Sequence, residues 1–207
     1  MSRIGCTGRG GFTLLELLVA LAIFSIIAVM AYGGLAVVLT QQTRTNEQAD
    51  RLSRLQMAYQ IMQRDIEQVI ARPIRDAFGD ERMLMIGQGS EGEMEFTRGG
   101  WNNPAGHQRS TLQRVAYQVV DQELVRSVWY VLDRAQDTEP FETGIIDGVE
   151  EMEIRFLGDG EEWQDQWPPS DQLQSLNDLP QIIPRAVEIS IDIEFVGPLI
   201  WLFQLGE

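Results

Sequence analysis

The side chains that most often carry out catalysis are scarce in this sequence. It contains one histidine, His107, and one cysteine, Cys6, so neither an internal disulfide nor a site built from several histidines can form. Ser110 follows His107 in a polar, glycine-rich segment, but no nucleophile elbow or cysteine partner accompanies the pair. The sequence has no lysine, which excludes a phosphate-binding P-loop. These counts exclude many classes of enzyme, and no motif here predicts an active site or a cofactor.

Carboxylates offer one candidate metal site. An acidic segment with two tryptophans, residues 158–178, could present hard oxygen ligands to Ca²⁺. The carboxylates concerned are Asp159, Glu161, Glu162, Asp165 and Asp171. Their spacing does not match the calcium loop of an EF-hand, which needs alternating Asp or Asn ligands and a closing Glu. We expect a solvated acidic loop without a metal, and a bound calcium ion is the alternative.

The composition is that of an acidic chain that can fold. The 207 residues carry 16 arginines against 31 acids, for a formal charge of −15, and 44% of them are hydrophobic. This is enough apolar surface for a core, so global disorder is excluded. Nucleic acid is excluded as a partner, because neutralising phosphates requires clustered basic side chains. Residues 73–207 hold nine arginines and 26 acids, a net charge of −17, which indicates an exposed, solvated head.

A long apolar segment near the N-terminus predicts a membrane anchor. Residues 17–39 contain no charged side chain, and as a helix they would span about 35 Å, enough to cross a bilayer core. Arg3 and Arg9 precede this segment without an acidic residue. The positive-inside rule therefore keeps the N-terminus in the cytoplasm and sends the rest of the chain across the membrane. The apolar run is too long for a typical secretory signal, and no small-x-small cleavage site closes it.

The residues in front of the apolar run resemble a known processing signal. Gly11 and Phe12 are followed by Thr13-Leu14-Leu15-Glu16, so a glycine, an aromatic and a single acid stand at a specific spacing. This pattern resembles the class III signal of type IV pilins and pseudopilins. The resemblance implies that a prepilin peptidase cuts between Gly11 and Phe12, removes the leader 1–11 and N-methylates Phe12. It also implies a single-pass inner-membrane protein with a periplasmic head.

Glu16 is the one acid in this apolar helix. A carboxylate costs about 2.5–3.5 kcal/mol at the centre of a bilayer, although the dipole at a helix N-terminus favours negative charge there. The resemblance implies a role in assembly, in which Glu16 pairs with the methylated amine of Phe12 in a neighbouring subunit. The alternative is a plain membrane anchor in which Glu16 lies at the interface.

An apolar seam predicts that the helix continues as a stem over residues 40–72. Apolar residues are spaced alternately by three and four, and we expect them to pack on this chain's own sheet: Leu52, Leu55, Tyr59, Met62, Ile66 and Val69. A coiled coil with another chain is the alternative. The solvated face is expected to carry Arg51, Arg54, Gln56, Gln60, Arg64, Asp65 and Glu67. The stem should end at Arg72, because the residue before Pro73 disfavours helix.

After Pro73 the apolar residues alternate with a period of two, which predicts strands. Residues 187–195 and 152–156 alternate as half-buried antiparallel strands do, and residues 113–120 and 124–132 flank a polar turn and predict a hairpin. Shorter candidates are 83–86, 94–97 and 199–205. The predicted fold is α+β, a long N-terminal helix packed on an antiparallel β-sheet head. The predicted parts are the leader 1–11, the membrane segment 12–39, the stem 40–72 and the head 73–207.

Two segments of the predicted head resemble one particular family of pseudopilins. Leu124–Ala135 and Leu179–Ile189 resemble recurring segments of minor pseudopilin J of type II secretion systems. This family implies a pilin-like fold and a structural role, without an active site, in a tip complex with pseudopilins I, K and H. That complex primes a pseudopilus that drives folded proteins across the outer membrane. One alternative is a minor type IV pilin for adhesion, twitching or DNA uptake, whose head usually carries a cysteine loop that is absent here. A membrane-anchored hydrolase would need a polar constellation that we do not find.

Overall fold

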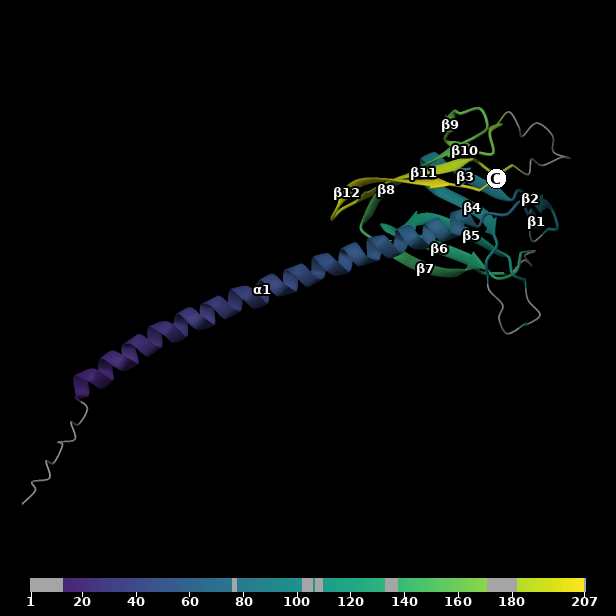
Figure 1. Ribbon diagram of the computed structural model, residues 1–207. Helices are drawn as coiled ribbons and strands as arrows, with labels where there is room; N and C mark the ends of the chain where they lie inside the picture. The colour runs from purple at the N-terminus through teal and green to yellow at the C-terminus, as the bar shows by residue number, and fades with distance from the viewer. Residues whose placement is uncertain are drawn as a thin grey trace, which may run out of the picture. The chain divides into compact units, whose positions relative to one another are not determined.

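The computed structural model in Figure 1 describes residues 13–75, 78–101, 106, 110–132, 138–170 and 182–206. In this part of the chain one α-helix, α1 (Leu14–Glu67), is followed by the strands β1 to β12 and a short 3₁₀ helix, η1 (Gly89–Glu91). The chain divides into two compact units, Met1–Leu52 and Ser53–Glu207. The α+β class predicted from the sequence is confirmed.

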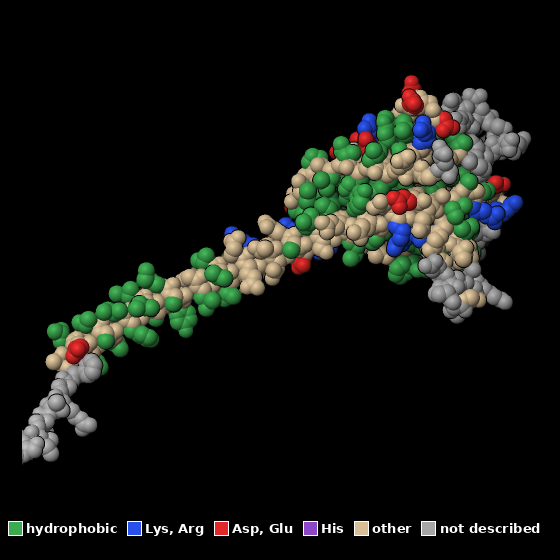
Figure 2. Space-filling view, in the orientation of Figure 1, with side chains coloured by type: hydrophobic (Ala, Val, Ile, Leu, Met, Phe, Trp, Pro, Cys, Tyr) green, Lys and Arg blue, Asp and Glu red, His purple; other side chains and the backbone are tan. Residues whose placement is uncertain are grey.

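In the first unit, α1 presents apolar side chains to its surroundings. The large hydrophobic residues from Leu14 to Leu39 are all exposed, and Figure 2 shows hydrophobic side chains along this part of the helix. Ser25 and Thr40 donate their hydroxyls to carbonyls one turn earlier, at 2.8 and 2.9 Å, so these polar groups are satisfied within the helix. Among the described residues, α1 is the one helix long and apolar enough to cross a membrane. This surface requires lipid or other helices to cover it.

The helix ends at Glu67, five residues before the predicted end at Arg72. Gln68 forms a turn, and Val69 forms an isolated antiparallel bridge with Arg98. The N–H of Ile70 donates to the carbonyl of Thr97 at 3.0 Å. Two consecutive β-branched residues, Val69 and Ile70, favour extended backbone, and pairing with a neighbouring strand satisfies their hydrogen bonds. Pro73 therefore does not set the end of the helix.

The described residues of the second unit form three antiparallel sheets. In the six-stranded sheet the order is β10 (Gln166–Trp167), β3 (Met85–Gln88), β4 (Glu93–Arg98), β5 (Gln113–Val120), β6 (Glu123–Trp129) and β7 (Phe141–Asp147). The four-stranded sheet has the order β12 (Gly197–Gln204), β11 (Ala186–Ile193), β8 (Val149–Leu157) and β9 (Trp163–Gln164). The short strands β1 (Ile74–Arg75) and β2 (Glu81–Arg82) pair with each other.

Most of the long strands lie where alternation predicted them. The hairpin of β5 and β6 turns at Asp121 and Gln122, whose φ angles of 50° and 62° suit a tight two-residue turn. The predicted second strand ends at Trp129 instead of Leu132. β7 was not predicted, because its residues are mostly exposed and show no apolar alternation. The short strands β9 and β10 lie inside the segment that was expected to be a loop.

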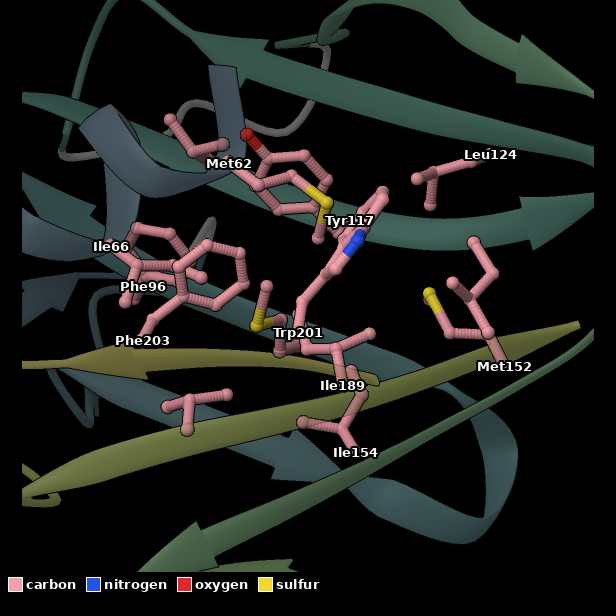
Figure 3. Packing of buried hydrophobic residues seen from close by; sticks show 14 of the residues in the cluster. Met62, Ile66, Phe96, Tyr117, Leu124, Met152, Ile154, Ile189, Trp201 and Phe203 are labelled. Atoms are coloured by element: carbon pink, nitrogen blue, oxygen red, sulfur yellow. The ribbon is translucent and has the colours of Figure 1, made fainter. Parts of the chain in front are cut away.

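The core lies between the two larger sheets and the last turns of α1. Figure 3 shows Met62 and Ile66 of the helix beside Phe96 and Tyr117 of the six-stranded sheet, with Trp201 and Phe203 of the four-stranded sheet also against them. The ring of Tyr59 lies 5.7 Å from that of Trp201 and 5.3 Å from that of Phe203, measured between centroids. The end of the helix thus joins both sheets through one hydrophobic cluster.

Ile66→Ala should lower the free energy of unfolding by about 2–5 kcal/mol, because Ile66 is fully buried and its removal leaves a cavity. Leu52→Ala, on the same helix at a position that is 54% exposed, is the matched control and should change it by less than about 0.5 kcal/mol. Both are measured by denaturant unfolding of the full chain in detergent. Equal losses of stability in the two variants would contradict the burial of Ile66 in the core.

The 3₁₀ helix η1 crosses β8 at very short range. The N–H of Gly89 donates to the carbonyl of Asp165 at 2.7 Å, and a Cβ at Gly89 would overlap the carbonyl oxygen of Ile154. Gly92 closes the turn with a φ of 64°. Only glycine allows the backbone to approach this closely.

Gly89→Ala is therefore expected to destabilise the head by about 1–3 kcal/mol, since backbone atoms and not a flexible side chain must shift. Gly160→Ala is the control, because a Cβ there meets no atom within 4 Å. Thermal unfolding of the two variants measures the difference. Tolerance of alanine at Gly89 would show that η1 is not held against β8.

Candidate functional site

The start of α1 carries the residues next to the predicted processing signal. Gly11 and Phe12 themselves lie outside the described residues. Thr13 caps the helix, because the N–H of Glu16 donates to Thr13 Oγ1 at 3.3 Å. The side chain of Glu16 is exposed in the first turn, where the helix dipole favours a carboxylate. Within the described residues Glu16 forms no ion pair, so its charge is available to another chain.

The residues of the predicted stem seam lie in three different environments. Met62 and Ile66 are buried, and Leu55 and Tyr59 are half-buried against the hydrophobic cluster. Val69 also packs there, but from the bridge beyond the helix. Leu52 is exposed. The contribution of this seam to stability stays a prediction.

Asp65 was expected on the solvated face, and that prediction is wrong, because its side chain is completely buried. Arg98 on β4 donates Nη1 to Asp65 Oδ1. On β5, Tyr117 donates its hydroxyl to Asp65 Oδ2 at 2.7 Å, and on β6, Arg126 donates Nε to the same oxygen at 2.5 Å. One helical carboxylate thus links three adjacent strands through charge-assisted hydrogen bonds.

The electrostatics of this cluster follow from burial and from the charge of Asp65. Burial raises the pKa of Tyr117 well above its usual value of 10.0, and the adjacent Asp65 carboxylate raises it further. Burial lowers the pKa of Arg126, but the hydrogen bond and the charge of Asp65 outweigh burial, so this pKa is raised. Arg126 is therefore held in its charged form and the phenol of Tyr117 in its neutral form. The cluster therefore acts as an anchor between α1 and the sheet.

Because the pKa of Tyr117 is raised, we predict that the protein loses stability in alkaline solution. The pKa of Tyr117 in the folded protein lies above the unfolded value of 10.0. Its contribution to the free energy of unfolding is therefore complete below pH 10 and is lost as the pH rises through the folded pKa. Above pH 10 the free energy of unfolding should therefore fall by about 1.4 kcal/mol per pH unit. Tyr117→Phe should flatten that part of the pH–stability curve in denaturant titrations. The same slope in wild type and variant would contradict the assignment.

The acidic segment does not gather into a metal site within the described residues. Asp159, Glu161, Glu162 and Asp165 are exposed, while Asp171 and also His107 lie outside the described residues. No group of three or more side chains suited to a metal ion is found in the part of the chain that the structure describes. Arg155 forms an ion pair with Glu188 and lies 5.6 Å from the centre of the Trp163 ring, so this surface is locally organised by charge.

Comparison with protein families identifies two matching regions. The family described as "Type II secretion system (T2SS), protein J" matches residues 33–205. The one described as "Prokaryotic N-terminal methylation motif" matches residues 6–32. Together they cover nearly the whole sequence, the motif on the N-terminal segment and the family on the rest.

Relatives and solved structures agree with these matches. Proteins named "Type II secretion system protein J" from Escherichia coli and Klebsiella pneumoniae are 33% and 30% identical, over 95% and 94% of this chain and 96% and 94% of their own lengths. The fold is similar to a chain in the crystal structure of the GspK-GspI-GspJ complex of enterotoxigenic E. coli. The TM-score is 0.64 and the identity 27%, with 76% of this chain and 98% of that chain covered.

Proposed function

Because this chain belongs to the type II secretion system protein J family, we propose that it is a minor pseudopilin, a structural subunit of the pseudopilus tip with no catalytic activity of its own. The observation that carries the proposal is the family match across residues 33–205, which includes the described head as far as Leu205. In this role the subunit primes the filament that exports folded proteins across the outer membrane. The alternative of a surface pilin finds no such support.

We further propose that prepilin peptidase cuts the Gly11–Phe12 bond and methylates the new amine of Phe12. The methylation motif over residues 6–32 supports this, as does the capped helix that begins directly after the cut. The leader 1–11, with Arg3 and Arg9, stays in the cytoplasm before cleavage, and the head lies in the periplasm. Residues 12–39 anchor the mature protein in the lipid of the inner membrane.

In this role, Glu16 acts in the assembly of the pseudopilus. Its exposed carboxylate has no basic partner within the described chain, and an unpaired charge in lipid is costly. Pairing with the methylated amine of Phe12 in a neighbouring subunit removes this cost only when subunits associate. The charge therefore favours the assembled filament over the free subunit and fixes the axial offset between neighbours.

The proposed partners are pseudopilins I and K, with H further along the tip. The solved structure that this fold resembles is a complex of GspK, GspI and GspJ, which supports the assignment. The head carries a net charge of −17, so copies of this chain repel one another, which favours a single copy beside different neighbours. The edge strand β12 exposes Ile200 and Leu202 by 68% and 59%, an apolar surface suited to a partner.

Deletion of the gene tests this function. Loss of exoprotein secretion with normal surface motility and DNA uptake is the expected result. Full secretion together with loss of twitching would support a type IV pilin instead. Complementation with the intact gene, and with one lacking codons 17–39, separates the need for the membrane segment from the presence of the head.

A further inference from the structure

In the described part of the chain the two larger sheets end in four edge strands, and three of these are protected against pairing with another chain. β9 and β10 have two residues each, too few to hold a further strand. β7 carries Glu142 and Asp147, and a β-bulge interrupts its pairing with β6 between Leu124 and Val125. Charged side chains and bulges of this kind prevent the addition of a strand.

The fourth edge strand, β12, differs in length, regularity and charge. It pairs with β11 through eight successive residue pairs without a shift, and it contains no charged residue. No described strand pairs with its other side. Pro198 protects only the beginning of the strand, because it has no N–H to donate. Along Leu199–Gln204, about 20 Å of edge, every second residue therefore turns its backbone N–H and C=O away from β11 to an open side.

The two faces of β12 have different surroundings. Trp201 and Phe203 lie in the core, where the rings of both pack against Tyr59, and Figure 3 shows both in the hydrophobic cluster. Their burial holds the strand in its extended form, so a partner that pairs with it does not have to order it first. On the other face Ile200 and Leu202 are exposed by 68% and 59%.

This apolar surface is limited to the edge strand itself. On β11, Ser190 lies opposite Ile200 and Glu188 lies opposite Leu202, and Glu188 forms an ion pair with Arg155. A partner that lay flat over the sheet would bury these polar and charged groups, which is costly. A strand beside β12 places its own side chains next to Ile200 and Leu202 and leaves β11 in water.

We propose that the free edge of β12 binds an extended segment of another protein, which adds a strand to the four-stranded sheet and carries an apolar side chain at every second position. Backbone hydrogen bonds to Leu199–Gln204 hold the segment, and its apolar side chains pack beside Ile200 and Leu202. A second copy of this chain is disfavoured, because two heads of charge −17 repel each other. This inference goes beyond the proposed function, since it rests on the strand edge and holds whichever protein supplies the segment.

Calorimetric titration of the full chain in nonionic detergent tests the proposal. The probe is acetyl-Arg-Thr-Val-Thr-Val-Thr-Val-Arg-amide, because backbone hydrogen bonds supply the affinity and only the alternation has to match. The control peptide has Pro in place of the middle Val, so it keeps the charge but loses a donor, and it should bind at least about tenfold more weakly. Equal binding of the two peptides, or no saturable binding of the probe, would overturn the proposal.

Methylation of the peptide amides separates strand pairing from other modes of binding. Only every second residue of an added strand turns its N–H toward β12. N-methylation of the three Thr residues or of the three Val residues should therefore abolish binding in one case and leave it within about threefold in the other. Equal affinities of the two methylated peptides would contradict pairing at the edge.

Variants of the protein locate the site. Ile200→Thr combined with Leu202→Thr should weaken binding about three- to tenfold, because apolar cross-strand pairs are lost. Phe141→Thr, which removes a 60% exposed side chain from the bulged edge β7, is the matched control and should leave the affinity unchanged. All three side chains are exposed, so the unfolding midpoints should stay the same. Equal losses in the two variants would place the peptide elsewhere. A dimer of the chain alone, dissociated by the β12 variant in light scattering, would show that a second copy occupies the edge, which also overturns the proposal.

Discussion

Asp65→Asn is expected to lower the free energy of unfolding of the head by about 3–5 kcal/mol, because it leaves two arginines facing a neutral amide. Arg98 and Arg126 are mostly buried, with side chains 6% and 16% exposed, so water replaces the lost carboxylate only in part. Denaturant unfolding measures the change. For many small domains a loss of this size is a large part of the total stability.

Glu67→Gln is the control for Asp65→Asn. It makes the same change of charge two residues along α1, but its side chain is exposed, so we expect less than about 0.5 kcal/mol. If Asp65→Asn unfolds with the same midpoint as Glu67→Gln, the buried cluster does not anchor the helix. Arg126→Gln provides a second check and should also be strongly destabilising.

Glu16→Ala is expected to reduce secretion at least tenfold while the protein is still processed and still reaches the membrane. The head should keep its stability, since Glu16 belongs to the other compact unit. Removal of the acid also eases insertion into lipid, so the membrane level should not fall. The measurements are exoprotein activity in the medium and the amount of the chain in the inner membrane.

Glu47→Ala removes another exposed acid from the same helix and should secrete normally. Secretion by Glu16→Ala at the wild-type level would exclude the pairing with the amine of Phe12. A protein that accumulates uncleaved would instead assign Glu16 to recognition by the peptidase.

Local patterns predicted much of the fold. The β5–β6 hairpin followed from two alternating runs around a two-residue turn, and β8 and β11 from strict alternation. The end of α1 was misplaced, because Pro73 is a local signal, whereas the helix is ended by pairing of Val69 with Arg98 on β4. Such pairing depends on residues distant in the sequence, so no window around the helix reveals it.

Asp65 shows what pattern reading misses. It lies three residues after Met62, on the same side of the helix as the buried seam, which was a signal that it could face inward. Arg126 gave a second signal, because it alternates with Leu124 and Val128 on the inward face of β6. A buried arginine requires an acid, but the sequence does not say which of the 31 acids supplies it. The pairing becomes evident only once helix and sheet are placed together.

Association with pseudopilins I and K is the most direct test of the proposed role. The full chain in detergent is mixed with the I and K proteins of the same secretion system and analysed by size-exclusion chromatography with light scattering. We predict a monomer when the chain is alone and a complex with one copy of this chain when the partners are present. A stable homo-oligomer with no affinity for either partner would contradict it.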